Sequence, residues 1–159
     1  MGTISEKDRK LIERAIENAE KSDMKFHIGS VMTENGKVVG NGYNSKRSQY
    51  CFDGKKFNHN SCHSEMAAII DASRRTQRRR RKRSRSGKSN IYTAKVSKEG
   101  MISNSFPCFR CVQWMKEVGI RHIFYIDNNR EIQIINIRDI DNFQSFKCYS
   151  DRICYWDRV

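Results

Sequence analysis

One histidine and two cysteines occur at spacings that suit a shared metal ion. His63 is followed two residues later by Glu65, and Cys108 and Cys111 stand three residues apart directly after Pro107. Imidazole nitrogen and thiolate sulfur are donors that zinc prefers in proteins. The pattern therefore predicts a zinc site with His63, Cys108 and Cys111 as metal ligands.

The number of protein ligands decides what such a site can do. A structural zinc site has four, whereas three leave a position for water, whose pKa the metal lowers towards neutrality. Glu65 is then placed to take up and return a proton of that water as general acid and base. The alternative is a closed structural site with Cys62 as fourth ligand. We expect Cys62 to pack instead as a small buried thiol beneath a helix start.

Both motifs open segments with helical character. Apolar residues at helical spacing predict one helix over about Ser64–Arg75 and another over Cys108–Val118, the second ended by Gly119. Pro107 is the only proline of the chain, and proline suits a helix start. In a first helical turn the two sulfurs can converge, and the positive end of the helix lowers thiol pKa values in favour of thiolate ligands.

The remaining pattern predicts a single α/β domain over residues 1–159. The last two strand-like runs are separated by only four residues, 127–130, too few for a crossover helix, so these strands should be antiparallel. We expect a three-layer fold with a five-stranded mixed sheet. The other expected elements are a helix over Thr3–Ser22, strands over Phe26–Thr33, Lys37–Tyr43, Asn90–Val96, His122–Ile126 and Glu131–Ile137, and loops over 44–62 and 97–106.

A run of positive charge interrupts this pattern. The formal net charge is +13, and residues 74–88 hold ten lysines and arginines with no acid, so removing them leaves +3. We expect a mobile basic insertion at about 74–89 that neutralises the phosphates of a single-stranded nucleic acid. A nuclear-localisation signal and a merely solvated loop are the alternatives. The candidate nucleic-acid contacts are Arg78, Arg79, Arg80, Arg81, Lys82 and Arg83.

The sequence also bears on where the protein acts. It has no run of about 18 apolar residues that could span a membrane, and its charged, helical first 20 residues do not resemble a secretory signal. We expect an intracellular protein, cytoplasmic or nuclear, whose six cysteines are free thiols or metal ligands. An aromatic C-terminal tail at about 138–159 should pack on the domain.

Together, the H-x-E and P-C-x-x-C motifs resemble the signature of the zinc-dependent cytidine deaminase superfamily. The similarity covers about residues 23–137 and includes the strand-like runs at 26–31 and 39–44. It implies the cytidine deaminase-like fold, one catalytic Zn²⁺ per chain and assembly into a homo-oligomer. Glu65 is implied to be the catalytic proton carrier.

The resemblance also implies a reaction and a substrate pocket. Water adds to the carbon that bears the exocyclic amine, Glu65 protonates the ring nitrogen and then the leaving amine, and ammonia departs. Phe26 is implied to line the base pocket and Asn44 to contact the nucleoside. The backbone near Ser64 is implied to touch the edge of the base.

Features of more than one subfamily are present. The tight last turn is similar to free-cytidine deaminases and to bacterial toxin deaminases that act on DNA, whereas Gly42-Tyr43-Asn44 looks like deoxycytidylate deaminases. Because of the basic run, we expect cytosine deamination in single-stranded DNA or RNA. The alternatives are a free cytidine, deoxycytidine or deoxycytidylate deaminase, an adenosine deaminase acting on nucleic acid, and a non-catalytic nucleic-acid-binding zinc protein.

Overall fold

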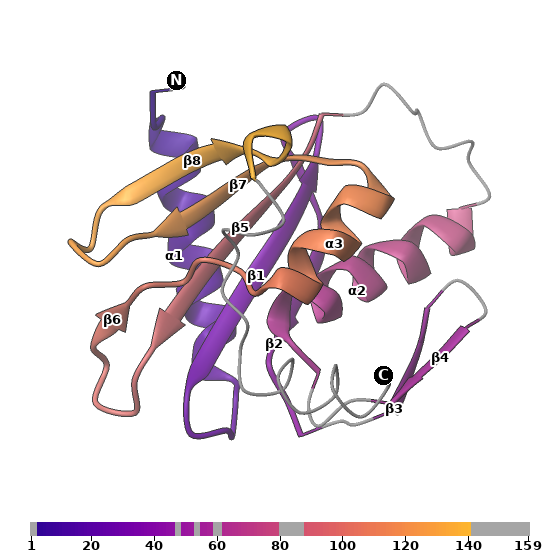
Figure 1. Ribbon diagram of the computed structural model, residues 1–159, viewed down its shortest axis with the longest axis horizontal. Coiled ribbons are helices and arrows are strands. Elements are labelled where there is room, and N and C mark those ends of the chain that lie inside the picture. Colours follow the sequence, from indigo (N-terminus) through magenta and orange to yellow (C-terminus); the bar gives the residue numbers. More distant parts are fainter. Residues whose placement is uncertain (1–2, 47–48, 53–54, 59–61, 80–87, 141–159) are drawn as a thin grey trace.

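The computed structural model of the chain describes residues 3–46, 49–52, 55–58, 62–79 and 88–140. Helices and strands follow one another in the predicted order, with three short strands added (Figure 1). The helices are α1 (Glu6–Glu20), α2 (Ser64–Arg79) and α3 (Phe109–Val118). The strands are β1 (His27–Glu34), β2 (Lys37–Tyr43), β3 (Gln49–Phe52), β4 (Lys55–Asn58), β5 (Ser89–Val96), β6 (Ile102–Ser103), β7 (Ile120–Ile126) and β8 (Ile132–Asn136), and a short 3-10 helix, η1 (Ile137–Asp139), follows β8.

The central sheet is mixed, as predicted. Its strand order is β2-β1-β5-β7-β8, in which β5 and β7 run parallel and the other neighbours are antiparallel. The antiparallel pairing of β7 with β8 is confirmed and follows from the short turn between them. The strand count differs by one, because β6 pairs with the end of β5 and makes a sixth strand. Two residues are too few to leave a strand pattern in the sequence.

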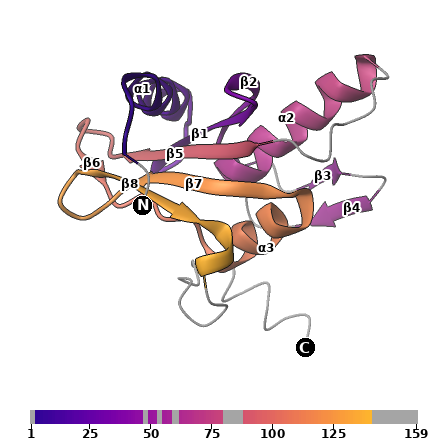
Figure 2. The same cartoon turned by 90° about the horizontal axis from the view of Figure 1, so that it is seen from above.

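Three layers form because successive side chains of β1 and β5 point to opposite faces of the sheet. Val31 and Tyr92 belong to the core cluster on the α1 side. Met32 and Ile91 belong to the cluster that α2 and α3 share. Figure 2 shows α1 and α3 on opposite sides of the sheet. The three-layer arrangement expected from the sequence is therefore present.

Helix α1 begins with a capping box formed by Ser5 and Asp8. The Ser5 hydroxyl accepts a hydrogen bond from the Asp8 amide at 3.1 Å, and the Asp8 carboxylate accepts one from the Ser5 amide at 2.9 Å, which completes a capping box. The Tyr92 hydroxyl donates to the other oxygen of the same carboxylate at 2.8 Å. This contact ties the start of α1 to the middle of β5.

Helix α2 lies close against β2 because glycines occupy the facing positions of the strand. A Cβ at Gly42 would overlap the Ser64 carbonyl and the Ala68 amide, and one at Gly40 would overlap the Ala68 carbonyl. Any larger residue would push the helix away from the sheet. These glycines therefore set how closely α2 approaches the sheet, and the predicted site residues lie at the start of this helix.

Two further segments differ from the sequence-based expectation. The predicted loop at 44–62 contains the antiparallel hairpin of β3 and β4, whose four-residue strands lack a regular apolar alternation. Helix α2 extends to Arg79, so the start of the predicted basic insertion is helical. Residues 80–87 and the tail from 141 lie outside the described residues. None of the helices in the described ranges has the length and apolar character needed to span a bilayer.

Candidate active site

His63 is held immediately before α2. The Ala67 amide donates to the His63 carbonyl at 3.0 Å, which starts the helical hydrogen-bond pattern. On the preceding side, Ser45 and Cys62 exchange two backbone hydrogen bonds of 3.0 Å. The half-buried imidazole is thus fixed between a β-bridge and a helix start.

The two predicted cysteine ligands lie at the start of α3. Cys108 is the N-cap residue, with φ −72° and ψ 165°, and the Val112 amide donates to its carbonyl at 3.0 Å. The helix therefore starts one residue later than predicted, and Pro107 precedes the cap instead of occupying the first turn. Gly119 ends the helix in the left-handed conformation, with φ 85°, as predicted.

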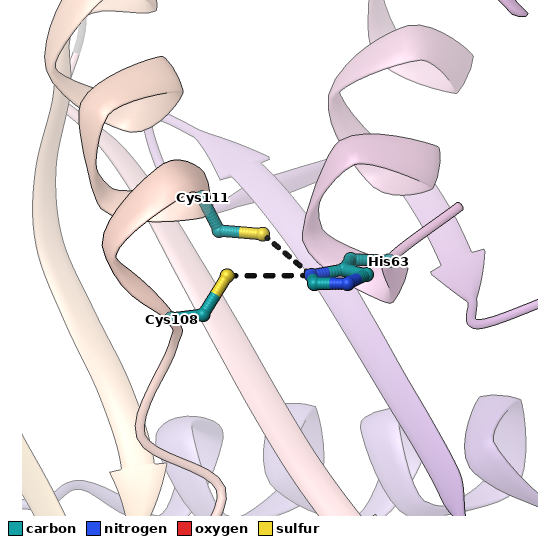
Figure 3. A group of neighbouring side chains, drawn as sticks. All are labelled: His63, Cys108 and Cys111. Atoms are coloured by element: carbon teal, nitrogen blue, oxygen red, sulfur yellow. Dashed lines mark hydrogen bonds between the residues drawn. The ribbon is translucent and has the colours of Figure 1, made fainter. Parts of the chain in front are cut away.

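The three predicted ligands come together (Figure 3). The Sγ atoms of Cys108 and Cys111 each lie 3.3 Å from His63 Nδ1, and all three donor atoms lie within 4.8 Å of one another. In a tetrahedral zinc site, bond lengths of about 2.0 and 2.3 Å separate a nitrogen and a sulfur donor by about 3.5 Å. The side chains present therefore fit a zinc ion.

Cys62 is not part of this group. It is 3 % exposed and belongs to the core cluster beneath α2 and α3. Its Sγ atom contacts the neighbouring His63 carbonyl at 3.7 Å. Among the described residues, the donor cluster holds three ligands, and Cys62 packs as the buried thiol that the sequence favours.

Glu65 lies directly beside the donor cluster and is only 5 % exposed. Its Oε2 atom lies 3.5 Å from Cys111 Sγ, and its Oε1 atom accepts a hydrogen bond from the Thr93 hydroxyl at 3.3 Å. A buried carboxylate at this place can exchange protons with a group bound next to the metal. The structure thus brings Glu65 together with the three ligands.

Phe26 stands at the amino end of β1 and is 51 % exposed. The ammonium group of Lys95 lies 4.6 Å from the centre of its ring, and that of Lys25 lies 5.7 Å away. Lys95 is two residues beyond Thr93 on β5, so both side chains point to the same face of the sheet. The ring and two cations therefore form a surface on the site side of the sheet; neither lysine was predicted.

Asn44 is buried and is used by the backbone of the chain itself. Its Oδ1 atom accepts from the Ile28 amide at 2.8 Å, and its Nδ2 atom donates to the Phe26 carbonyl at 2.7 Å. These bonds join the end of β2 to the start of β1. The predicted contact of Asn44 with a nucleoside remains a prediction, and in this structure the side chain positions Phe26.

Ser64 is fully buried, and its hydroxyl lies 2.8 Å from the Ser30 hydroxyl. Ser30 is the pairing partner of Thr93 across β1 and β5. Sequence reasoning missed Ser30 and Thr93, because their contacts form only when β1 and β5 have paired and α2 has packed across them. The predicted contact of Ser64 with the base edge stays a prediction.

The predicted nucleic-acid contacts fall mainly outside the described residues. Arg78 and Arg79 form the last residues of α2, and 80–83 are not described. Of the basic run, Arg74 and Arg75 are exposed on α2, and Arg75 pairs with Asp71 at 3.2 Å. Nucleic-acid binding by this run remains a prediction.

The arrangement of donors and carboxylate matches a known family. The sequence profile of the cytidine and deoxycytidylate deaminase zinc-binding region matches residues 5–127. The chain belongs to this deaminase family. No significant match was found among curated protein sequences. Family membership and the cluster of one histidine and two cysteines support one Zn²⁺ per chain.

Two solved deaminases share the fold at low sequence identity. Cytidine deaminase from Burkholderia pseudomallei superposes with a TM-score of 0.57 and 18 % identity, over 82 % of this chain and 93 % of that one. The dCMP deaminase of cyanophage S-TIM5, in complex with dCMP and dUMP, gives a TM-score of 0.53 and 14 % identity, over 79 % and 85 %. These similarities establish the cytidine deaminase-like fold.

Proposed function

We propose that the chain is a zinc-dependent hydrolytic deaminase that converts cytosine to uracil in single-stranded DNA or RNA. The observation that carries the proposal is the buried Glu65 carboxylate, 3.5 Å from a sulfur of the three-donor cluster. A structural zinc site needs only its ligands, and a buried carboxylate beside them would have no role there. A non-catalytic zinc protein is therefore disfavoured.

The residues present support each step of the hydrolysis. His63, Cys108 and Cys111 would hold the zinc ion, which when bound lowers the pKa of water and supplies a nucleophile at neutral pH. Glu65 would accept a proton from that water, deliver it to the ring nitrogen, and pass a second proton to the leaving amine. The balanced reaction consumes cytosine and water and yields uracil and ammonia.

The choice of cytosine rests on the family. The matching profile is that of cytidine and deoxycytidylate deaminases, and the two similar structures are a cytidine deaminase and a dCMP deaminase. No comparison favours adenine.

The surface formed by Lys25, Phe26 and Lys95 favours a substrate that carries phosphate. An exposed aromatic ring offers a base a stacking surface, and the flanking ammonium groups can neutralise phosphates on either side. Neither lysine makes an ion pair with any described residue. Both charges therefore remain available for a ligand, and the basic run at 74–88 would add further phosphate contacts.

A free deoxynucleotide is the second candidate. The dCMP deaminase of cyanophage S-TIM5 has a similar fold and binds dCMP and dUMP. One phosphate could be held by Lys95 alone, and the basic run would then be unnecessary for turnover.

The test is to incubate zinc-loaded protein with single-stranded DNA and RNA, with dCMP and with cytidine, and to read conversion by sequencing or mass spectrometry. We expect cytosine-to-uracil changes in a single-stranded polymer, reduced in the Lys25→Ala/Lys95→Ala double variant but not in Lys10→Ala, whose exposed side chain lies on α1 across the sheet. Deleting residues 76–87 should weaken polymer conversion and spare dCMP. Conversion of dCMP or cytidine alone would identify the second candidate.

A further inference from the structure

Thr93 lies in the middle of β5 and is fully buried. Its side chain is on the face of the sheet that carries Ile91, towards α2 and α3. The hydroxyl lies 3.3 Å from Glu65 Oε1, and because a carboxylate can only accept, the hydroxyl is the donor. This separation exceeds the ideal of about 2.7 Å for such a bond, and catalytic hydrogen bonds commonly tighten when substrate binds.

The two oxygens of Glu65 have different neighbours. Oε1 contacts Thr93, whereas Oε2 lies 3.5 Å from Cys111 Sγ, on the side of the donor cluster. We propose that Thr93 is a positioning residue for Glu65: it holds Oε1 so that Oε2 is the atom that exchanges protons in the reaction. This inference rests on the proposed deaminase function but assigns a residue that the family motif does not include.

The position of Thr93 is itself fixed. The Ser105 hydroxyl donates to the Thr93 carbonyl at 2.9 Å and accepts from the Ile126 amide, also at 2.9 Å. Thr93 is thus tied through Ser105 to the end of β7, in addition to its pairing within the sheet. Its β-branched side chain adds a stiff χ1 angle. A hydroxyl held in this way can restrict the rotation of a neighbouring carboxylate.

A second hydroxyl contact lies beside this one and provides a comparison. Ser30 faces Thr93 across β1 and β5, and its hydroxyl contacts Ser64, the residue before Glu65, at 2.8 Å. The Ser30 contact fastens the first turn of α2 to the sheet but does not touch the Glu65 carboxylate. If Thr93 only fastened the helix, the loss of either contact would have the same consequences.

The kinetic test uses two substitutions of Thr93. Thr93→Val keeps the shape of the side chain and removes the hydroxyl, while Thr93→Ser keeps the hydroxyl. We expect Thr93→Val to lower kcat by about tenfold or more with KM changed less than about twofold, because a misplaced catalytic group slows chemistry more than binding. Thr93→Ser should recover most of kcat. The substrate is the cytosine compound that wild type converts fastest among those named above.

Ser30→Ala is the matched control. It should lower the thermal unfolding midpoint at least as much as Thr93→Val while kcat stays within about threefold of wild type. Zinc content, measured by elemental analysis, should equal that of wild type in all three variants. Equal kcat losses in Thr93→Val and Ser30→Ala, or no rescue by Thr93→Ser, would overturn the assignment.

A second measurement does not depend on turnover. Crystal structures of the zinc-loaded wild type and of Thr93→Val should show the Glu65 carboxylate bonded to Thr93 in the first and rotated in the second. An unchanged carboxylate in Thr93→Val contradicts the proposal even if no substrate is found. Absence of turnover in wild type, with the rotation observed, instead counts against the deaminase function and leaves the positioning role supported.

Discussion

Tyr92 and Thr93 are neighbours on β5, and each donates its hydroxyl to a carboxylate in the first turn of a helix. Tyr92 reaches Asp8 of α1 at 2.8 Å on one face of the sheet, and Thr93 reaches Glu65 of α2 at 3.3 Å on the other. The same local arrangement therefore joins a helix start to the central strand on both sides. The two carboxylates have different roles, because the second oxygen of Asp8 and that of Glu65 have different neighbours.

Both oxygens of Asp8 are occupied within α1 and β5. Oδ1 accepts from Tyr92, and Oδ2 accepts from the Ser5 amide and hydroxyl. In Glu65 the second oxygen faces a cysteine of the donor cluster instead. A carboxylate whose acceptors are filled by its own fold stabilises a helix, whereas one with an oxygen directed at a metal site can take part in chemistry.

The largest effect is expected from removal of the metal. It should impair the site on the α2 side of the sheet and leave the α1 side unchanged. Cys111→Ser, or a chelator, should lower bound zinc well below one per chain and reduce deaminase turnover by at least about a thousandfold. Elemental analysis and an ammonia-release assay measure both quantities. Cys62→Ala is the control and should retain zinc; zinc loss equal to that of Cys111→Ser would indicate a closed four-ligand site.

A pair of glycine substitutions compares the two faces directly. A Cβ at Gly29 would overlap the Ala15 carbonyl of α1, and one at Gly42 would overlap the Ser64 carbonyl of α2. Each alanine variant should lose about 1–3 kcal/mol of unfolding free energy in urea titrations. Only Gly42→Ala should also lower kcat per folded, zinc-loaded molecule, because it displaces the helix that carries Glu65. A comparable kcat loss in Gly29→Ala would contradict this separation of roles.

Tyr92→Phe should affect stability alone. It removes the hydroxyl donor to Asp8 and is expected to cost about 1–2 kcal/mol of unfolding free energy. Its kcat should match wild type, in contrast to Thr93→Val at the next position. Chemical denaturation and steady-state kinetics on the two variants provide the comparison, and a lowered kcat in Tyr92→Phe would show that the faces are coupled.

The smallest expected effect is the pH dependence of the stability that Asp8 contributes at the start of α1. Burial opposes ionisation of Asp8, but hydrogen bonds from the Ser5 amide and from Tyr92 outweigh it and lower the pKa of the carboxyl below 3.8. A depressed folded-state pKa gives stability that is present above the unfolded value and lost as pH falls through the folded one. The difference in urea midpoint between wild type and Asp8→Asn should therefore be largest near neutral pH and shrink below about pH 4. A constant difference would show that Asp8 titrates as in the unfolded chain.

The donor cluster could be predicted from sequence because the spacing within each of its two motifs is local. Cys108 and Cys111 lie one helical turn apart, and His63 and Glu65 share one helix start. The core helices and long strands were predictable for the same reason, since their apolar periodicity extends over several turns or residues. The two-residue strand β6 and the short hairpin of β3 and β4 carry no such periodicity.

The hydroxyl contacts were not predictable, because they depend on strand pairing between distant segments. Thr93 meets Glu65 only after β5 has paired with β1 and α2 has packed across them, which the glycines of β2 permit. Nothing in the local sequence around Thr93 distinguishes it from an ordinary strand threonine. Asn44 is similar: its side chain bonds the backbone of Phe26 and Ile28, 18 and 16 residues earlier in the chain.

The proposed function depends on Glu65, the carboxylate beside the zinc ligands, performing deamination. The most direct test compares zinc-loaded wild type with Glu65→Gln, with uracil formation from single-stranded DNA, single-stranded RNA, dCMP and cytidine followed by mass spectrometry. We predict uracil from at least one of these substrates in wild type, and a loss of about 10²–10⁴-fold in Glu65→Gln at unchanged zinc content. Equal turnover by the two proteins, or no uracil from a wild type that carries one zinc per chain, would rule out this role of Glu65.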